Sequence, residues 1–274
     1  MTTRAFLLSA WDPGFAVPAA CIAALAAYGV HYRRRLRSRA VFFVLAVAIA
    51  FVALASPIGV LARGVLFSAH MLQHLLLLLA VPPLVLLGQP RGSRSEGSEG
   101  NPRREGAARH EGAAWGYLVP WAAGVGGMWI WHARPLCNAA ATSPGVQALQ
   151  SVSLIVMGLA FWRPILVSRP SDRLPPFAAM LYLFAACTAC TLLGIVITFS
   201  PVEVCSAYLK PTDAPGVVAM VRGQWGLSCK ADQEIGGLLM WVPACLVYVA
   251  AILATLGRYY GEEQTSEAAM RGAS

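Results

Sequence analysis

Charged side chains are scarce in this sequence. Only 12% of its 274 residues are Asp, Glu, Lys or Arg, whereas 57% are hydrophobic. A soluble domain usually carries about 25% charged residues. The scarcity therefore excludes an ordinary soluble protein, and the apolar runs follow one another too closely to leave room for a separate soluble domain. We predict an all-α, polytopic integral membrane protein.

Two further absences narrow this interpretation. No cleavable signal peptide is expected, because the apolar stretch Ala5–Ala10 is too short and Asp12 and Pro13 follow it. A nucleic-acid-binding surface is not expected either, although the net charge is +8. The basic residues stand mostly in short loops, where they are typical of orientation signals and of contacts with anionic lipid. We expect the lipid bilayer, and no nucleic acid, as a partner.

Seven apolar stretches are each close to the ~20 residues that a bilayer crossing requires. Together they predict a single membrane domain over residues 1–260, followed by a polar tail at 261–274. The seven predicted spans are Phe15–His31, Ala40–Pro57, Val65–Leu87, Ala114–Trp131, Val146–Leu166, Ala178–Ser200 and Ile235–Leu256.

The basic loops predict how the chain crosses the bilayer. The link Arg33–Arg39 between the first two spans carries five arginines and is the strongest positive-inside signal. Placing it in the cytoplasm puts the N-terminus outside and, after seven crossings, the C-terminus in the cytoplasm. The Gly/Ser-rich segment 91–113 is then a disordered cytosolic loop. The segment 201–234 is an outer loop that can fold over the mouth of the bundle.

Two histidines open the third span. His70 and His74 are four residues apart, about one helical turn, so they share a helix face that Met71 borders. An ionisable side chain inside a membrane helix is costly and points to function. With the predicted topology, Met128 and His132 at the end of the fourth span reach the same depth on the outer side. Imidazole and thioether ligands suit copper, and their mixture particularly suits Cu(I).

Other roles for these side chains stay open. The histidines can hydrogen-bond across helices, and the methionines can fill gaps in the packing. A zinc protease is excluded, because its His-x-x-x-His motif needs a glutamate directly after the first histidine and Met71 stands there instead.

Polar residues precede the seventh span at the predicted outer side. Asp232 and Gln233, with Met240 and Trp241 further along, are candidates for an outer working surface shared with the histidines. Asp232 can equally serve as an N-terminal helix cap with no other role. The pair Gly236–Gly237 predicts the close approach of a neighbouring helix.

The cysteines divide by location. Cys205 and Cys229 stand in the predicted outer loop, in an oxidising compartment where a disulfide between them would close the loop. Cys187 and Cys190 share one face of the sixth span. Inside an apolar helix we interpret them as two small buried residues rather than as a redox pair.

Six sequence motifs, taken together and in order, resemble a known family. They are His70–His74 continuing to Ala80–Leu84, Leu87–Pro90, Trp131–Pro135, Phe161–Pro164, Leu193–Ser200 and Asp232–Trp241. The chain resembles the seven-helix cytochrome c oxidase assembly factors of the CtaG type, which are associated with caa3-type oxidases.

The resemblance implies a multi-pass protein of the bacterial inner (plasma) membrane that helps to assemble a haem–copper oxidase. It implies no enzymatic turnover. It also implies that an oxidase subunit is the partner and that copper is delivered to it at the outer face. One stretch departs from the family pattern: the chain reads Ala148-Leu149-Gln150-Ser151 where span five of the family carries an acidic residue followed by histidine.

Three other functions stay open. A copper transporter would need a polar path to the cytoplasm, but the inner halves of the third and seventh spans, Leu75–Val81 and Val247–Leu256, are almost wholly apolar. A haem-binding redox protein would use His70 or His74 with His132 as axial ligands. A metal-free scaffold for an oxidase subunit would need none of the histidines as ligands.

Overall fold

The structure, a computed structural model, describes residues 2–11, 14–32, 39–89, 108–166, 173–209 and 215–271. Every regular element within these ranges is helical, which confirms the all-α prediction. The elements are α1 (Thr3–Ser9), α2 (Ala16–His31), α3 (Ala40–Ala55), α4 (Pro57–Ala62), α5 (Phe67–Leu75), η1 (Leu76–Ala80), α6 (Val81–Gly88), α7 (Ala108–Trp131), α8 (Arg134–Thr142), α9 (Pro144–Leu166), α10 (Pro176–Phe199), η3 (Ser206–Leu209), α11 (Pro215–Ala219), η4 (Met220–Gln224) and α12 (Cys229–Arg271).

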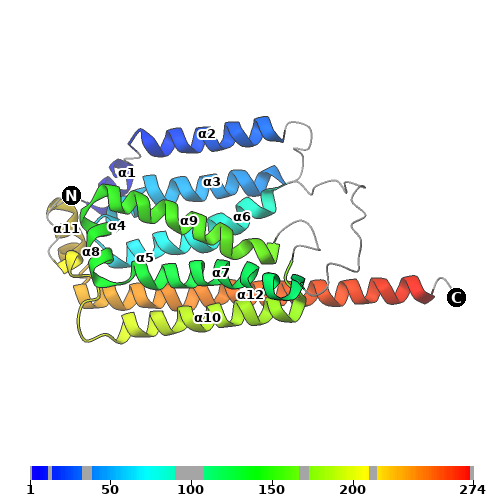
Figure 1. Cartoon of the computed structure of the whole chain (residues 1–274). Coiled ribbons are helices and arrows are strands. Elements are labelled where there is room, and N and C mark those ends of the chain that lie inside the picture. The colour runs from blue at the N-terminus through cyan, green and yellow to red at the C-terminus, as the bar shows by residue number, and fades with distance from the viewer. Residues whose placement is uncertain are drawn as a thin grey trace.

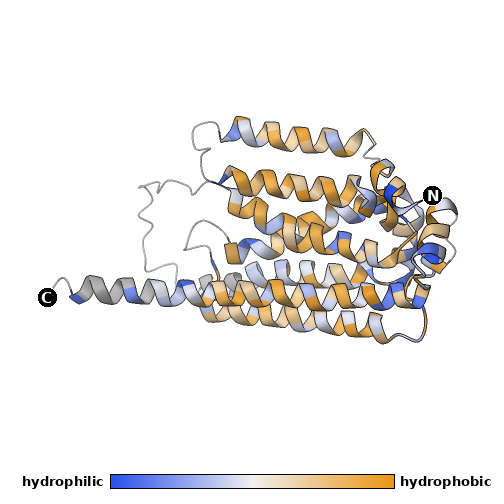
Figure 2. Ribbon diagram, turned by 180° about the vertical axis from the view of Figure 1, so that it is seen from behind, coloured by the Kyte–Doolittle hydropathy of each residue, from blue (hydrophilic) through white to orange (hydrophobic). Residues whose placement is uncertain are grey.

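The long helices lie side by side in one bundle (Figure 1). The short helices α1, α4, α8 and α11 gather at the end of the bundle that carries the N-terminus, and the last part of α12 extends beyond the opposite end. We call the N-terminal end the outer end, because the charge pattern predicts that it faces outward. Hydrophilic segments concentrate at the outer end, whereas the long helices of the bundle are mainly apolar (Figure 2).

Each of the seven predicted spans coincides with a long helix of the bundle. Four helical segments are long and apolar enough to cross a membrane: Phe67–Gly88, Pro144–Leu166, Pro176–Phe199 and Cys229–Gly261. Helices α2 and α3 are apolar but shorter, with 16 residues each. The structure thus has the helices of a membrane protein, while the count of seven crossings and the orientation stay predictions.

The third predicted span is one continuous helix with a local change of register. The segment η1 is a π-helical turn, in which the Val81 N–H bonds to the Leu76 carbonyl five residues earlier. Such turns form where the regular bonding ladder is interrupted, and Pro82 follows at once without an N–H of its own. Gly158 of α9 lies against this turn, since a Cβ there would stand 2.8 Å from the Leu78 carbonyl oxygen.

The predicted close approach at Gly236–Gly237 is confirmed. A Cβ on Gly236 would lie 2.6 Å from the Phe67 ring of α5, and one on Gly237 would lie 2.7 Å from the backbone nitrogen of Thr198 in α10. Two glycines at the start of α12 therefore let α5 and α10 pack directly against its backbone. This contact fixes the position of the helix that carries His70 and His74.

The predicted outer loop is folded where the structure describes it. It contains η3, α11 and η4, and its Tyr208, Met220 and Val221 are buried. Most of the basic link at Arg33–Arg39 and residues 91–107 of the predicted cytosolic loop lie outside the described residues. Helix α12 continues to Arg271, into the segment predicted as a polar tail.

Candidate metal centre

His70 and His74 lie in the interior of the bundle near its outer end. Helix α5 places them one turn apart, and their ring centroids are 4.3 Å from each other. The exposed fractions of the two residues are 0% and 1%. The predicted shared face is therefore present, and it points into the protein rather than toward lipid.

None of the four ring nitrogens of these histidines has a hydrogen-bond partner. Within the described part of the chain, six buried side-chain nitrogen or oxygen atoms lack a partner: these four, Nε2 of Gln150 and Nε1 of Trp162. Buried polar groups in folded proteins are nearly always bonded, and an exception calls for an ion, a water or a functional reason. Five of these six atoms belong to His70, His74 and Gln150.

His132 joins the pair from the end of α7. Its ring centroid lies 5.4 Å from that of His74. Its Nδ1 is 2.7 Å from the Met128 carbonyl oxygen. A carbonyl can only accept, so Nδ1 carries the hydrogen and, in the neutral ring, Nε2 carries a lone pair. That Nε2 lies 3.1 Å from Sδ of Met71.

The structure thus brings together His70, His74, His132 and Met71, as the predicted topology required. They form two pairs, His70 with His74 and His132 with Met71, which meet where His74 faces His132. No group of three or more His, Cys, Asp or Glu side chains among the described residues has the geometry to hold a metal ion. The arrangement suits an ion that needs few protein ligands at a time.

Three predicted site residues lie elsewhere. Met128 contributes its carbonyl to His132, while its side chain lines a small apolar cavity together with Cys190. Met240 is fully buried, and its carbonyl accepts from the Cys190 thiol. Trp241 packs on Gly194 of α10. The last two residues serve the α10–α12 contact.

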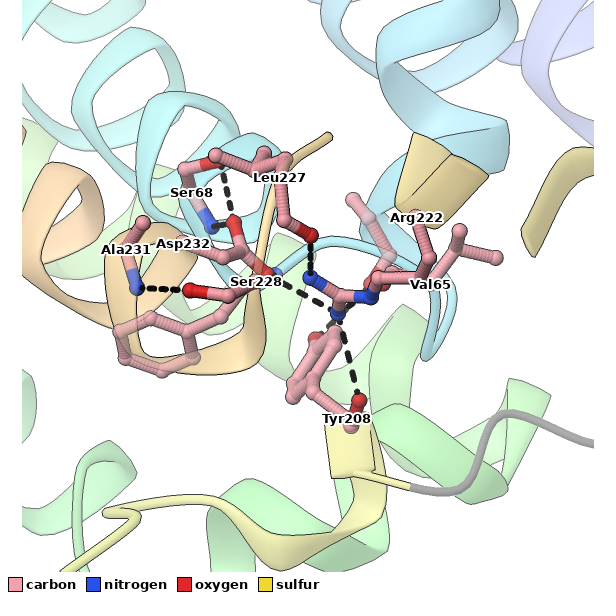
Figure 3. Close-up of polar contacts among 10 residues, drawn as sticks. Val65, Ser68, Tyr208, Arg222, Leu227, Ser228, Ala231 and Asp232 are labelled. Carbon is pink, nitrogen blue, oxygen red and sulfur yellow. Dashed lines mark hydrogen bonds and ion pairs between the residues drawn. The ribbon is translucent and has the colours of Figure 1, made fainter. Parts of the chain in front are cut away.

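Asp232 caps a helix, but not its own. The carboxylate accepts from the backbone N–H of Phe67 at 2.9 Å and of Ser68 at 3.0 Å, and from the Ser68 hydroxyl at 2.6 Å (Figure 3). These are the free N–H groups at the start of α5, where the helix dipole also favours an anion. Asp232 thereby fixes the end of the helix that carries His70 and His74.

Arg222 completes this network and was not foreseen from the sequence. Its guanidinium lies 3.6 Å from the Asp232 carboxylate and donates to the carbonyl oxygens of Leu227 at 2.8 Å, Val65 at 3.4 Å and Tyr208 at 3.5 Å (Figure 3). It joins the outer loop to the start of α5. Nothing in its sequence neighbourhood distinguishes it from other basic loop residues.

Tyr208 and Gln233 hold the outer loop over the histidines. The Tyr208 ring centroid lies 5.9 Å from that of His70, and its hydroxyl donates to the Ala62 carbonyl at 2.9 Å. Burial raises the pKa of this hydroxyl well above its usual value, so it stays protonated. Gln233 accepts from the Val204 N–H at 2.9 Å and donates to the Ile197 carbonyl at 3.1 Å.

The cysteines predicted to form a disulfide are near each other but not bonded. Cys205 and Cys229 carry free thiols in the structure, and both line a small cavity with Asp232. Cys187 and Cys190 remain in the α10–α12 contact, where Cys187 Sγ lies 3.1 Å from Sγ of Cys245.

With this geometry described, the chain can be compared with known proteins. The sequence profile of the family described as cytochrome c oxidase caa3 assembly factor (Caa3_CtaG) matches residues 23–262. The chain belongs to this family. The match runs from α2 into α12 and so includes every residue of the histidine site. The resemblance seen in the sequence motifs is confirmed.

The chain is also similar to a curated protein. The Caa3_CtaG chain is 23% identical over 206 residues to an uncharacterised protein of Mycobacterium leprae (strain TN), which covers 71% of this chain and 30% of that protein. The chain thus spans about a third of the length of this curated relative. No solved structure matches the Caa3_CtaG chain.

The stretch in which the chain departs from the Caa3_CtaG motifs lies in the histidine site. Gln150 of α9 is 1% exposed and its amide lies beside His74. Its Nε2 is among the buried atoms without a partner. The stretch in which the resemblance leads us to expect a histidine therefore places an amide next to the histidine pair.

Proposed function

We propose that this Caa3_CtaG protein binds Cu(I) at His70, His74, His132 and Met71 and passes it to a cytochrome c oxidase subunit during assembly. The observation that most supports this proposal is that none of the four ring nitrogens of His70 and His74 has a hydrogen-bond partner. The protein acts without chemical turnover, in the inner membrane of a bacterium, and copper is its cargo.

The unpartnered nitrogens are energetically unfavourable without a ligand. A buried polar group that loses its hydrogen bond costs about 1–3 kcal/mol. Bulk water does not relieve this cost in the middle of a membrane bundle. Each neutral imidazole still offers one lone pair, and a cation bound to these lone pairs converts the unfavourable site into a favourable one.

The chemistry of the second pair supports copper over other ions. His132 Nε2 and Met71 Sδ are both electron-pair donors, and they face each other at 3.1 Å. A thioether is a poor ligand for hard cations such as Mg²⁺ or Ca²⁺ and a good one for Cu(I). Cu(I) also accepts two or three ligands, as two neighbouring pairs provide.

The two pairs suggest how copper is released. An ion held by His70 and His74 has the His132–Met71 pair as its next neighbour, so it can exchange one ligand at a time. The Gln150 amide stands beside His74 in place of a further imidazole that would hold copper more tightly. Weak, low-coordinate binding suits a protein that must give its cargo away.

The position of the site favours delivery on the predicted outer side. A small cavity lined by Phe67, Cys205, Cys229 and Asp232 lies at the outer end, next to Tyr208. Below His74 the helix continues with Leu75 and the turn η1, whose side chains are apolar and mostly buried. That interior offers no polar path toward the cytoplasm, which weighs against a transporter.

A metal-free scaffold is the second candidate, because no three His, Cys, Asp or Glu side chains of the described residues form a ready-made metal site. In that case the oxidase subunit would dock on the protein without any need for the two histidines. The two functions differ in what they predict for histidine variants.

Copper content decides between them. The purified protein is loaded with Cu(I) and analysed by elemental analysis as wild type, as His70→Ala/His74→Ala, and as His31→Ala, a matched control at the opposite end of the bundle. We expect copper in the wild type and the control and its loss from the double variant. Equal copper in all three, or none in any, contradicts the proposal.

The scaffold is tested in cells. In a strain that lacks this protein, the double variant restores oxidase activity fully if the protein is a metal-free scaffold. It fails to restore activity if copper binding is the function, provided that the variant is present in the membrane at the wild-type level.

A further inference from the structure

The described structure contains an apolar crevice of about 600 Å³ between α2, α3, α6 and α9. Most of its lining is apolar, and the proposed copper function does not use it.

Small side chains create the crevice. Ala16, Ala20 and Ala24 follow one another at four-residue spacing and so form one face of α2. They are opposed by Ala46 and Ala50 of α3. Larger side chains at these positions would fill the space and bring α2 against the bundle.

Helix α2 is nevertheless held in place, at its inner end. The Tyr28 hydroxyl donates to the Gly88 carbonyl at 2.6 Å, and the Tyr28 ring stacks on Phe43 at 4.1 Å between centroids. The crevice therefore lies between a helix fixed at one end and the rest of the bundle. Figure 1 shows α2 at the edge of the bundle.

The dimensions of the crevice indicate a slender occupant. Along α3 it extends from Phe43 to Leu54, about 16 Å at a rise of ~1.5 Å per residue. This is close to half of the ~30 Å apolar thickness of a bilayer, that is, one leaflet. An extended hydrocarbon chain is slender and flexible enough to follow a crevice of this length.

The polar groups of the crevice gather at its outer end. Arg63 follows α4 and has an exposed side chain, while Gln147 and Ser151 belong to the outer half of α9. Deeper in the crevice the lining is mainly apolar and includes Val81 and Val85, with Gln73 of α5 as a polar exception. A cation and two polar groups at the rim above an apolar channel match a negatively charged headgroup with an acyl chain below it.

We propose that this crevice is a binding site for one anionic phospholipid of the predicted outer leaflet. One acyl chain occupies the channel between α2, α3 and α9, and the phosphate lies at Arg63. The site is independent of copper binding, so each proposal stands or fails separately. The bound lipid replaces the side-chain packing that the alanines of α2 do not provide.

The site also adjoins the histidines through α5. Gln73 lines the crevice, and its Nε2 donates to the Ala53 carbonyl of α3 at 2.8 Å. Gln73 directly precedes His74. A lipid that fills the crevice therefore supports the contact between α3 and the helix that carries the histidine pair.

Native mass spectrometry of the full chain, released from nanodiscs of equal phosphatidylglycerol and phosphatidylcholine, tests the proposal. We expect the wild type to retain one phospholipid and to prefer phosphatidylglycerol by about fivefold, the effect of one basic group at an anionic lipid surface. Ala24→Leu/Ala50→Leu fills the crevice and is expected to lose most of the bound lipid. Ala23→Leu/Ala48→Leu, at neighbouring positions outside the crevice, is the matched control and keeps it.

A second variant separates headgroup recognition from filling. Arg63→Gln leaves the channel open and is expected to retain lipid but lose the preference for phosphatidylglycerol, whereas Arg134→Gln at the same end keeps it. This comparison also decides the matter if the filled variant does not fold. Equal lipid retention by the two double variants, an unchanged preference in Arg63→Gln, or a peptide or quinone as the retained molecule overturns the proposal.

Discussion

At the scale of single residues, one carbonyl sets the chemistry of His132. The Met128 carbonyl binds Nδ1 and leaves the lone pair of Nε2 toward Met71. The two methionines therefore have different parts: Met128 acts through its backbone, and Met71 acts through its sulfur. Side-chain substitution should separate them.

Met71→Leu is expected to weaken Cu(I) binding by about tenfold or more, the range seen when a group that supports a metal centre is lost. Leucine has a similar volume, so the fold should be retained at a cost below ~1.5 kcal/mol. Met128→Leu is the matched control and keeps both the carbonyl and the affinity. The measurement is competition with a Cu(I) chelator, and equal affinities for the two variants would contradict a role for the Met71 sulfur.

We expect Asp232 to contribute more to the free energy of unfolding than an exposed acidic residue of the same helix. Asp232→Ala removes the cap of α5 and leaves Arg222 without its carboxylate, so we expect a loss of about 2–3 kcal/mol, typical of hydrogen bonds to a charged group. Glu234→Ala removes only an exposed pair with Lys230 at 3.6 Å and should cost less than ~0.5 kcal/mol. Thermal unfolding in detergent compares the two variants. Similar losses of stability in the two variants would show that the Asp232 cap of α5 contributes little to the free energy of unfolding.

At the scale of elements, the packing of α12 depends on its first turns. Gly236 and Gly237 place the α12 backbone against α5 and α10, and a side chain at either position meets backbone or ring atoms. A long helix with a small-residue patch is typical of contacts between membrane helices. The same helix is open around Gly257, where a Cβ would meet nothing within 4 Å.

Gly237→Ala is therefore expected to destabilise the protein by about 1–3 kcal/mol, as other over-packed positions do. Gly257→Ala is the matched control and should be neutral or slightly stabilising, because alanine is the better helix former. The unfolding temperature of the two variants is the measurement. An unchanged unfolding temperature in Gly237→Ala would mean that α10 and α12 can move apart without a loss of stability.

At the scale of the whole molecule, the orientation in the membrane decides which side receives copper. The basic links predict that the C-terminus is cytoplasmic and that the short helices face outward. A fluorescent protein fused after Ser274 should therefore be bright, and alkaline phosphatase fused at that point should be inactive. Phosphatase inserted after Gly145, beyond α8, should be active. The opposite pattern would place the histidine site on the cytoplasmic side.

Much of this architecture follows from local sequence patterns. Apolar runs predict where the helices of the bundle lie, four of which are long enough to cross a membrane, and the four-residue spacing places His70 and His74 on one face. The glycine pair predicts where a neighbouring helix comes close. Each of these depends on helix geometry and composition alone, so one sequence suffices.

Long-range relations were predicted only in part. Asp232 was considered as a cap of its own helix, but it caps α5, because the nearest free N–H groups belong to a segment 164 residues away. Met240 and Trp241 were expected at the outer surface, but they lie in the α10–α12 contact. Arg222 was missed. The spacing of residues in the sequence does not reveal which distant residue such a side chain contacts.

The sequence by itself determined the helical class, the family and the histidine motif, and it predicted the membrane environment, because hydrophobic length and helical period are local properties. Only the tertiary structure decided that His132 and Met71 join the pair and that its ring nitrogens lack partners. It also decided that α2 leaves a crevice beside the bundle. These features depend on distances between helices, which arise from packing across the whole chain.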